Sequence, residues 1–160
     1  MSFLRAIGFL SLPLLFLAAC DPAAREANVN QDKYIDDYIT ANFADNTVYR
    51  EDGVCRVVIT PGQASAPVVE KGDSVYLFYA GYTFGQNGPE AQFTLDSSMV
   101  RIGSGLVRGL EKGLPGAQLG EESLVIFSAD DGYGSTQVGL VPENTALMFD
   151  VIIADIKKNQ

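Results

Sequence analysis

The chain has 160 residues, with 11 Lys and Arg against 20 Asp and Glu, a formal net charge of −9, no His, no Trp and two Cys. Without His there can be no Ser–His–Asp or Cys–His nucleophilic site and no His metal ligand, and two distant Cys cannot supply a four-ligand zinc site, so we expect neither a metal nor a cofactor. An acidic chain also disfavours phosphate-backbone contacts, which require clustered Lys and Arg, and we expect no nucleic-acid partner.

Residues 1–19 are predicted to be a signal peptide. Arg5 precedes an uncharged run, Ala6–Ala19, which would span about 21 Å as a helix and so falls short of a bilayer core of about 30 Å. The junction Leu17-Ala18-Ala19-Cys20 resembles the bacterial lipobox, in which the Cys becomes the first mature residue and carries lipid. An ordinary secretory signal with a chance Cys is the alternative. The lipobox implies a lipid anchor on Cys20, a place in the bacterial cell envelope (facing the periplasm or the outer surface) and a mature charge of −10, because Arg5 is removed.

An extension is predicted to precede the main domain. Residues 20–30 are small and polar, as in a tether. The apolar residues of Gln31–Phe43 recur at offsets of three and four, which predicts a helix with one apolar stripe and with Asn30 as its N-cap. A hairpin turning at Asp52-Gly53 follows, so that residues 31–60 form a helix and hairpin extension and residues 61–160 form the domain. Cys55, in the second strand of this hairpin, is expected to be a buried, inert thiol.

The rest of the chain is rich in predicted strands. We expect strands at Ser74–Thr83, Ala91–Leu95, Val100–Ile102, Ser123–Ala129 and Ala146–Ile156, with a single short helix at Leu106–Gly113 that ends before Pro115-Gly116. The elements do not alternate as βαβ units, so a doubly wound fold is not expected. Gly103–Gly109 therefore does not predict a dinucleotide site, since its third Gly also falls one position late.

Six motifs in order resemble the FKBP-type peptidyl-prolyl isomerase domain over Val68–Lys157. They are Lys71–Val75 with Phe78–Tyr82, Leu95-Asp96-Ser97-Ser98, Val107–Leu114, Leu119-Gly120-Glu121, Gly132-Tyr133-Gly134 and Leu140–Val151. The resemblance implies an α+β fold, in which a twisted antiparallel sheet wraps around one short α-helix, here with an N-terminal helix appended. It also implies prolyl isomerisation of proline-containing polypeptides and, with the lipobox, a lipid-anchored folding helper for envelope proteins.

The resemblance places a substrate pocket on named residues. The expected catalytic residues are Tyr79, Asp96 and Tyr133, with the Asp96 carboxylate holding the Tyr79 hydroxyl and the Tyr133 hydroxyl donating to the substrate carbonyl. The expected pocket wall consists of Leu95, Leu106, Val107, Leu110, Leu140, Val141 and Phe149. This chemistry needs no acid, base or metal, because the barrier is the loss of amide resonance, about 18–20 kcal/mol.

Two positions depart from the family pattern. Leu110 stands where the family usually carries the Trp of the pocket floor, and Leu95 stands where it carries a Phe. Phe93, two residues earlier, is expected on the same face of its strand as Leu95. A less aromatic pocket leaves open the alternative of an FKBP-fold chaperone or binding lipoprotein with weak or no isomerase activity.

The back of the predicted sheet is unexpectedly apolar. In the family's sheet, eight residues would face the short helix and the core: Val75, Leu77, Tyr79, Val125, Phe127, Leu147, Phe149 and Val151. Period two then places seven apolar residues on the other face: Tyr76, Phe78, Tyr82, Leu124, Ile126, Met148 and Ile152. Such a face would expose a large patch on an isolated domain. We therefore expect the Gln31–Phe43 helix to cover it, with the hairpin strands or a second copy in a homodimer as alternatives.

Overall fold

A computed structural model of the chain describes residues 22–159. Its elements are α1 (Pro22–Asn42), β1 (Val48–Glu51), β2 (Val54–Thr60), β3 (Ser74–Gly85), β4 (Gly88–Arg101), α2 (Arg108–Gly113), β5 (Glu122–Phe127), the short 3₁₀ helix η1 (Ala129–Asp131) and β6 (Ala146–Lys157). The predicted signal peptide and the predicted lipidation site at Cys20 lie outside the described residues. Within residues 22–159, no helix combines the length and the hydropathy needed to cross a bilayer.

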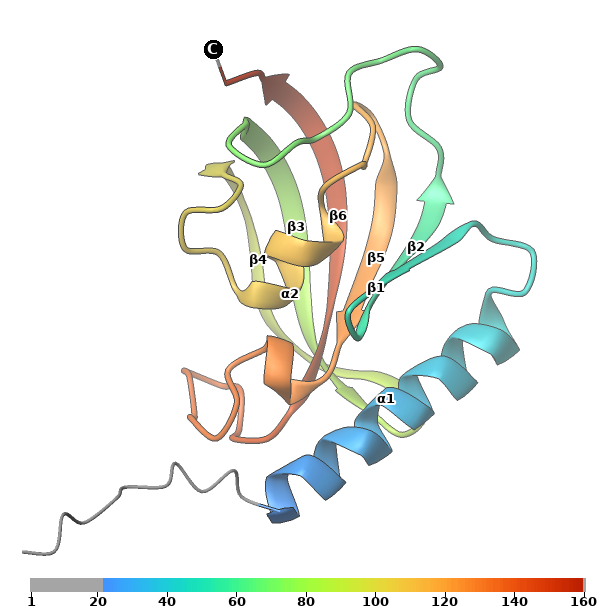
Figure 1. Ribbon diagram of the computed structural model, residues 1–160, viewed down its shortest axis with the longest axis vertical. Helices are drawn as coiled ribbons and strands as arrows, with labels where there is room; N and C mark the ends of the chain where they lie inside the picture. Colours follow the sequence, from blue (N-terminus) through green and yellow to red (C-terminus); the bar gives the residue numbers. More distant parts are fainter. Residues whose placement is uncertain (1–21, 160) are drawn as a thin grey trace, which may run out of the picture.

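All neighbouring strands of the sheet run antiparallel, in the order β1-β2-β5-β6-β3-β4. Figure 1 shows the sheet curving around α2 on one side, while α1 crosses the other side. This is the expected α+β architecture. The predicted hairpin is also present: Asp52 and Gly53 both have positive φ, 44° and 83°, as a tight turn of the primed type requires.

β4 is one strand of 14 residues, although the sequence predicted two short strands. The polar run Asp96-Ser97-Ser98 suggested a break between them. The structure pairs this run with Leu77, Phe78 and Tyr79 of β3, and the ladder continues through it. Because β4 lies at the edge of the sheet and its polar side chains reach solvent, pairing with β3 overrides the local turn signal.

The main core lies between the sheet and α2. Val75, Leu77, Val125, Phe127, Leu147, Phe149 and Val151 face this side and are buried, as the alternation predicted, while Tyr79 is partly buried. α2 lies directly against β5 because two of its residues are Gly. A Cβ on Gly109 would lie 2.2 Å from the Phe127 ring, and one on Gly113 would lie 2.4 Å from Val125. This close contact fixes α2 as the floor of the main core.

A second core lies between the sheet back and α1. Ile35 and Ile39 are 1% and 2% exposed and pack with Val57, Ile126 and Met148. The expectation that the helix covers the sheet back is therefore confirmed for this part of the face, and the hairpin strands extend the face. Cys55 is buried in the same cluster, and burial raises the pKa of its thiol to about 11, as expected for an inert side chain.

α1 begins at Pro22, inside the segment expected to be a tether, so Asn30 is not its N-cap. The physical reason is local. Residues 23–27 read Ala-Ala-Arg-Glu-Ala, and all five are strong helix formers. Pro22 stands at the first helical position, where Pro is tolerated. The side chains of this segment are small, but its helix propensity is high, so the helix extends into the segment that was expected to be a tether.

Part of the sheet back remains uncovered among the described residues. Phe78 is 49% exposed, and Met99 and Ile152 are 44% and 41% exposed on the neighbouring strands. The ladder pairs Phe78 with Ile152 and pairs Tyr76 with Met99, so these four side chains share one face. We call these four residues, together with Leu95, the back patch.

Candidate functional site

A cavity of about 460 Å³ opens between β3, β4, α2 and the loop that follows η1. Its wall is mostly apolar, formed by Leu77, Tyr79, Phe93, Thr94, Val100, Gly105, Leu106, Val107, Leu110, Tyr133, Val138, Gly139, Leu140 and Phe149. Seven of the predicted site residues line it: Tyr79, Leu106, Val107, Leu110, Tyr133, Leu140 and Phe149. The structure thus brings these seven residues together around one cavity.

Aromatic rings build one side of the cavity. Phe149 has a central position, with the Phe93 ring edge-on at 5.6 Å and the Tyr79 ring tilted at 6.5 Å. Behind it, the Phe127 ring stacks on Phe149 at 5.9 Å and belongs to the main core. Edge-to-face and stacked pairs at these distances are favourable, so the cavity wall is continuous with a rigid core.

Leu95 does not line the cavity, which corrects the sequence prediction. The register changes from Gly81↔Thr94 to Tyr82↔Gln92, so Phe93 is an extra residue in β4 without a partner in β3. This bulge turns Phe93 and Thr94 toward the cavity. Leu95 pairs with Ala80 on the opposite face and is 75% exposed. Phe93 and Leu95 therefore lie on different faces, although strict alternation placed them together.

Gly81 has no room for a side chain, and the bulge is the reason. A Cβ at this position would lie 2.7 Å from both the Phe93 ring and the Thr94 side chain, and 2.9 Å from the Phe149 ring. The bare backbone of Gly81 is thus what lets the extra residue of β4 turn inward. The glycine in the Phe78–Tyr82 motif is explained by this close approach.

Asp96 lies outside the cavity wall, although it pairs with Tyr79 across the ladder. Its carboxylate is exposed and accepts a hydrogen bond from the backbone amide of Ser97 at 2.7 Å. The expected contact with the Tyr79 hydroxyl is not formed. At an edge strand, solvent and the local amide satisfy this carboxylate without help from the cavity.

Val141 lies behind the cavity. It is 1% exposed and belongs to the main core, so it supports the cavity wall without lining it. Leu140, its neighbour in sequence, is 78% exposed at the cavity rim. Leu110 is 5% exposed and forms the floor at the position where the resemblance implied a Trp.

Two tyrosines, Tyr79 and Tyr133, line the cavity. Burial raises the pKa of the Tyr133 hydroxyl, and the neighbouring Tyr79 raises it further, so Tyr133 keeps its proton at neutral pH. A protonated hydroxyl in an apolar cavity can donate to a carbonyl oxygen that enters it.

One carboxylate holds the loop at the cavity mouth. Glu111, on α2, accepts hydrogen bonds from the amides of Gly105 at 3.2 Å and Leu106 at 3.0 Å, and also from the amide of Gly103. Leu106 lines the cavity, so this carboxylate fixes part of the wall. The positive φ of Gly103 and Gly105, 90° and 106°, lets the loop fold back onto α2.

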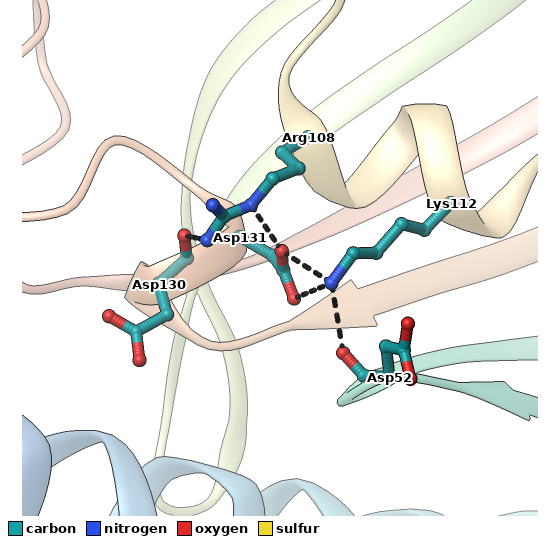
Figure 2. Close-up of polar contacts among 5 residues, drawn as sticks. All are labelled: Asp52, Arg108, Lys112, Asp130 and Asp131. Carbon is teal, nitrogen blue, oxygen red and sulfur yellow. Dashed lines mark hydrogen bonds and ion pairs between the residues drawn. The ribbon is translucent and has the colours of Figure 1, made fainter.

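A second carboxylate joins α2 to η1 (Figure 2). Asp131 is nearly buried, and its Oδ1 lies 2.6 Å from Arg108 Nε and 2.9 Å from Lys112 Nζ. Lys112 also donates to the Asp52 carbonyl in the β1–β2 turn at 3.1 Å, and Arg108 donates to the Asp130 carbonyl. The cluster places η1, and hence Tyr133 two residues later, beside α2.

Sequence reasoning missed several residues of the wall. Leu77 and Val100 were assigned to strands without a site role, and Phe93 was expected on the same strand face as Leu95 but was not named as a wall residue. Val138 and Gly139 lie in a loop whose only local signal was its Gly content. A bridge between Val138 and Val141 closes this loop tightly and turns Val138 toward the cavity.

Comparison with known proteins agrees with this geometry. Residues 66–154 match the family model described as FKBP-type peptidyl-prolyl cis-trans isomerase. FK506-binding protein 1 of Aspergillus oryzae is 32% identical over 116 residues, covering 65% of this chain and 98% of that protein. A peptidyl-prolyl cis-trans isomerase of Schizosaccharomyces pombe is 34% identical over 104 residues, covering 62% of this chain and 90% of that protein.

A solved structure supports the fold. The crystal structure of a peptidyl-prolyl cis-trans isomerase from Pseudomonas syringae pv. tomato superposes with a TM-score of 0.68 at 19% identity, covering 88% of this chain and all of that one. The family model matches more than half of the 160 residues, and the matched span contains every residue of the cavity wall. The chain therefore belongs to the FKBP-type peptidyl-prolyl cis-trans isomerase family.

Proposed function

We propose that this FKBP-type isomerase uses the cavity around Phe149 to turn X–Pro bonds of envelope proteins, while a lipid on Cys20 holds it at a membrane. The observation that carries the catalytic part is the apolar cavity with Tyr79 and Tyr133 in its wall, where burial raises the pKa of the Tyr133 hydroxyl. An apolar wall holds the proline ring. It also favours the twisted amide, because this state has lost resonance and has a smaller dipole than the planar one.

The Tyr133 hydroxyl is proposed to donate to the substrate carbonyl as the amide turns. A directed hydrogen bond that forms best in the twisted state lowers the barrier without acid–base chemistry. Phe93, Phe149 and Leu110 then supply the walls and floor of the proline site. Leu110 leaves the floor aliphatic, so shape and apolar contact are proposed to replace the aromatic face of a Trp.

A protease-coupled assay on an X–Pro peptide tests the catalytic part. Tyr133→Phe should lower kcat/KM about three- to tenfold, as expected for one lost hydrogen bond of about 0.7–1.4 kcal/mol. Tyr49→Phe is the matched control, because Tyr49 is 53% exposed on β1, outside the cavity. A wild-type rate no greater than the uncatalysed rate would favour an FKBP-fold binding protein over the enzyme.

The proposed lipid anchor rests on the Leu17–Cys20 motif. α1 begins two residues after Cys20, so the anchor would hold the folded domain close to the membrane through a helix. The mature charge of −10 disfavours adsorption to anionic lipid, which leaves the acyl chains as the attachment. Mass spectrometry of the mature N-terminus should find a lipidated Cys20, and Cys20→Ser should move the protein to the soluble fraction. An unmodified Cys20 would contradict the anchor.

We also propose that the back patch is where two copies pack in a homodimer. The uncovered apolar side chains lie on β3, β4 and β6, next to the part of the same face that α1 covers. Two sheet backs packed face to face would cover both patches at a sheet spacing of about 10 Å. Sedimentation velocity should show a dimer that Phe78→Asp abolishes and Thr40→Asp, exposed on α1, leaves intact. A monomer at all concentrations would contradict this proposal.

A further inference from the structure

The loop between η1 and β6 carries a large part of the cavity wall but has few buried anchors. It contributes Tyr133, Val138, Gly139 and Leu140 to the wall. From residue 132 to residue 145, Val141 is the only fully buried residue. Whatever holds the two ends of this loop therefore decides where Tyr133 lies.

A single side chain of α1 bridges the two ends. Gln31 is 6% exposed, and its carboxamide Oε1 accepts from the backbone amide of Ala129 at 2.8 Å. Its Nε2 donates to the backbone carbonyl of Asn144 at 2.7 Å. Ala129 precedes the loop and Asn144 closes it, 15 positions later. Figure 1 shows the amino-terminal half of α1 passing beside this loop.

The loop's own backbone completes the connection. The amide of Gly134 donates to the Ala129 carbonyl at 2.9 Å, and the amide of Asn144 donates to the Gly134 carbonyl at 2.7 Å. Asn144 has φ of 53°, in the left-handed region, and its carbonyl is the one that Gln31 holds. Gly134 directly follows Tyr133, so the closed network of Gln31, Ala129, Gly134 and Asn144 fixes the backbone beside the catalytic hydroxyl.

We propose that Gln31 is a positioning residue for the isomerase site, acting on Tyr133 through the loop ends. This inference rests on the proposed function of Tyr133. Gln31 lies outside residues 66–154, the part of the chain that matches the family model. α1 thus has two separable contacts. Ile35 and Ile39 cover the sheet back, and Gln31 holds the loop of the cavity.

The experiment compares Gln31→Met with Ile39→Val in the mature chain. Met has the length of Gln but can neither donate to Asn144 nor accept from Ala129 as the amide does. Ile39→Val weakens the packing of the same helix without touching the loop. Amide hydrogen exchange of residues 130–145 and separate measurement of kcat and KM are the readouts.

If the loop is ordered in only a fraction of the molecules, the apparent affinity of the protein for substrate is the intrinsic affinity multiplied by that fraction. Once substrate is bound, the loop is ordered again. We therefore expect Gln31→Met to accelerate exchange across residues 130–145 and to raise KM about fivefold with kcat changed less than twofold. Ile39→Val should lower Tm without either effect. Equal exchange in Gln31→Met and the wild type, or an equal rise of KM in both variants, would overturn the proposal.

Gln31→Glu is a more conservative variant that keeps the test valid if Gln31→Met fails to fold. Gln31→Glu keeps an acceptor for the Ala129 amide but, when ionised, has no donor for the Asn144 carbonyl. Exchange should then accelerate at residues 140–145 while the Ala129 amide stays protected, and uniform exchange at both ends would contradict the bridge. If the wild type lacks isomerase activity, the proposed function fails, whereas the exchange measurements still test the contact of Gln31 with the loop.

Discussion

Phe93 and Leu95 provide the sharpest test of the site, because the bulge in β4 places on opposite faces two residues that alternation assigns to the same face. Phe93 packs edge-on against Phe149 in the cavity wall, whereas Leu95 is 75% exposed on the back of the sheet. We predict that Phe93→Ala impairs catalysis and that Leu95→Ala does not.

The magnitudes follow from burial. Truncating a fully buried Phe to Ala costs about 3–5 kcal/mol, and Phe93 is partly buried, so we expect about 2 kcal/mol of lost stability. The same truncation opens the proline site, and a loss of about 1.4 kcal/mol of contact with the twisted amide would lower kcat/KM about tenfold. Leu95→Ala removes mainly solvent-exposed surface and should change stability by less than about 0.5 kcal/mol.

Urea denaturation and the protease-coupled assay measure these two effects on the same preparations. Phe93→Leu separates volume from aromaticity, because it keeps most of the bulk but loses the edge-on contact with Phe149. It should lie between the wild type and Phe93→Ala in kcat/KM. An equal loss of activity in Leu95→Ala and Phe93→Ala is the result that the family pattern predicts without the bulge, and it would contradict the placement of the two residues on different faces.

Three further predictions concern stability. Glu121→Ala should cost about 3–5 kcal/mol in urea denaturation, because it leaves the Arg56 guanidinium buried without its partner. Glu121→Gln should cost less, and equal losses would contradict this account. Hydrogen bonding from Lys158, and then from two backbone amides, lowers the pKa of the Asp73 carboxyl below its usual 3.8. The ionised Asp73 carboxylate stabilises the fold at pH values above the pKa that this group has in the unfolded chain. The stabilisation is lost as the pH falls through the lower pKa of the folded state, so Asp73→Asn should make Tm decline less steeply below about pH 4. An equally steep fall of Tm below about pH 4 in Asp73→Asn and in the wild type would contradict the prediction. Burial raises the pKa of Asp150, and its folded carboxyl binds a proton more tightly than the unfolded one, so this group destabilises the fold at pH 7 and less so as pH falls. Asp150→Asn should therefore raise Tm at pH 7, and a lower Tm would show that the charge has a stabilising partner.

Alternation of apolar residues predicted much of the fold because it is a local property of strands. Val75, Leu77, Val125 and Phe127 were assigned to the core side, and all four are buried there. The same alternation failed at Leu95, because a bulge is set by how β4 meets β3 and not by the sequence of β4 alone. It also could not show that Asp96 would stay in solvent.

The cavity was predictable to the extent that ordered motifs fix which elements surround it. Tyr79, Leu110, Tyr133 and Phe149 lie in four separate motifs and meet at one cavity. Val138 carried no such signal, because its position depends on a loop closed by contacts with distant elements. Gln31 was one polar residue of a predicted helix, and nothing local indicated that it would reach residues 98 and 113 positions away.

The residues and their order were enough to predict the family, the strand-rich class, the α2 floor and the absence of His and Trp from the site. They also explained the excess of apolar residues on the sheet back, since the helix stripe of Ile35 and Ile39 needed a partner surface. The sequence did not predict which residues of β4 face the cavity, how far α1 extends or what holds the loop that carries Tyr133. These features depend on strand register and on contacts between distant segments, which local periodicity does not encode.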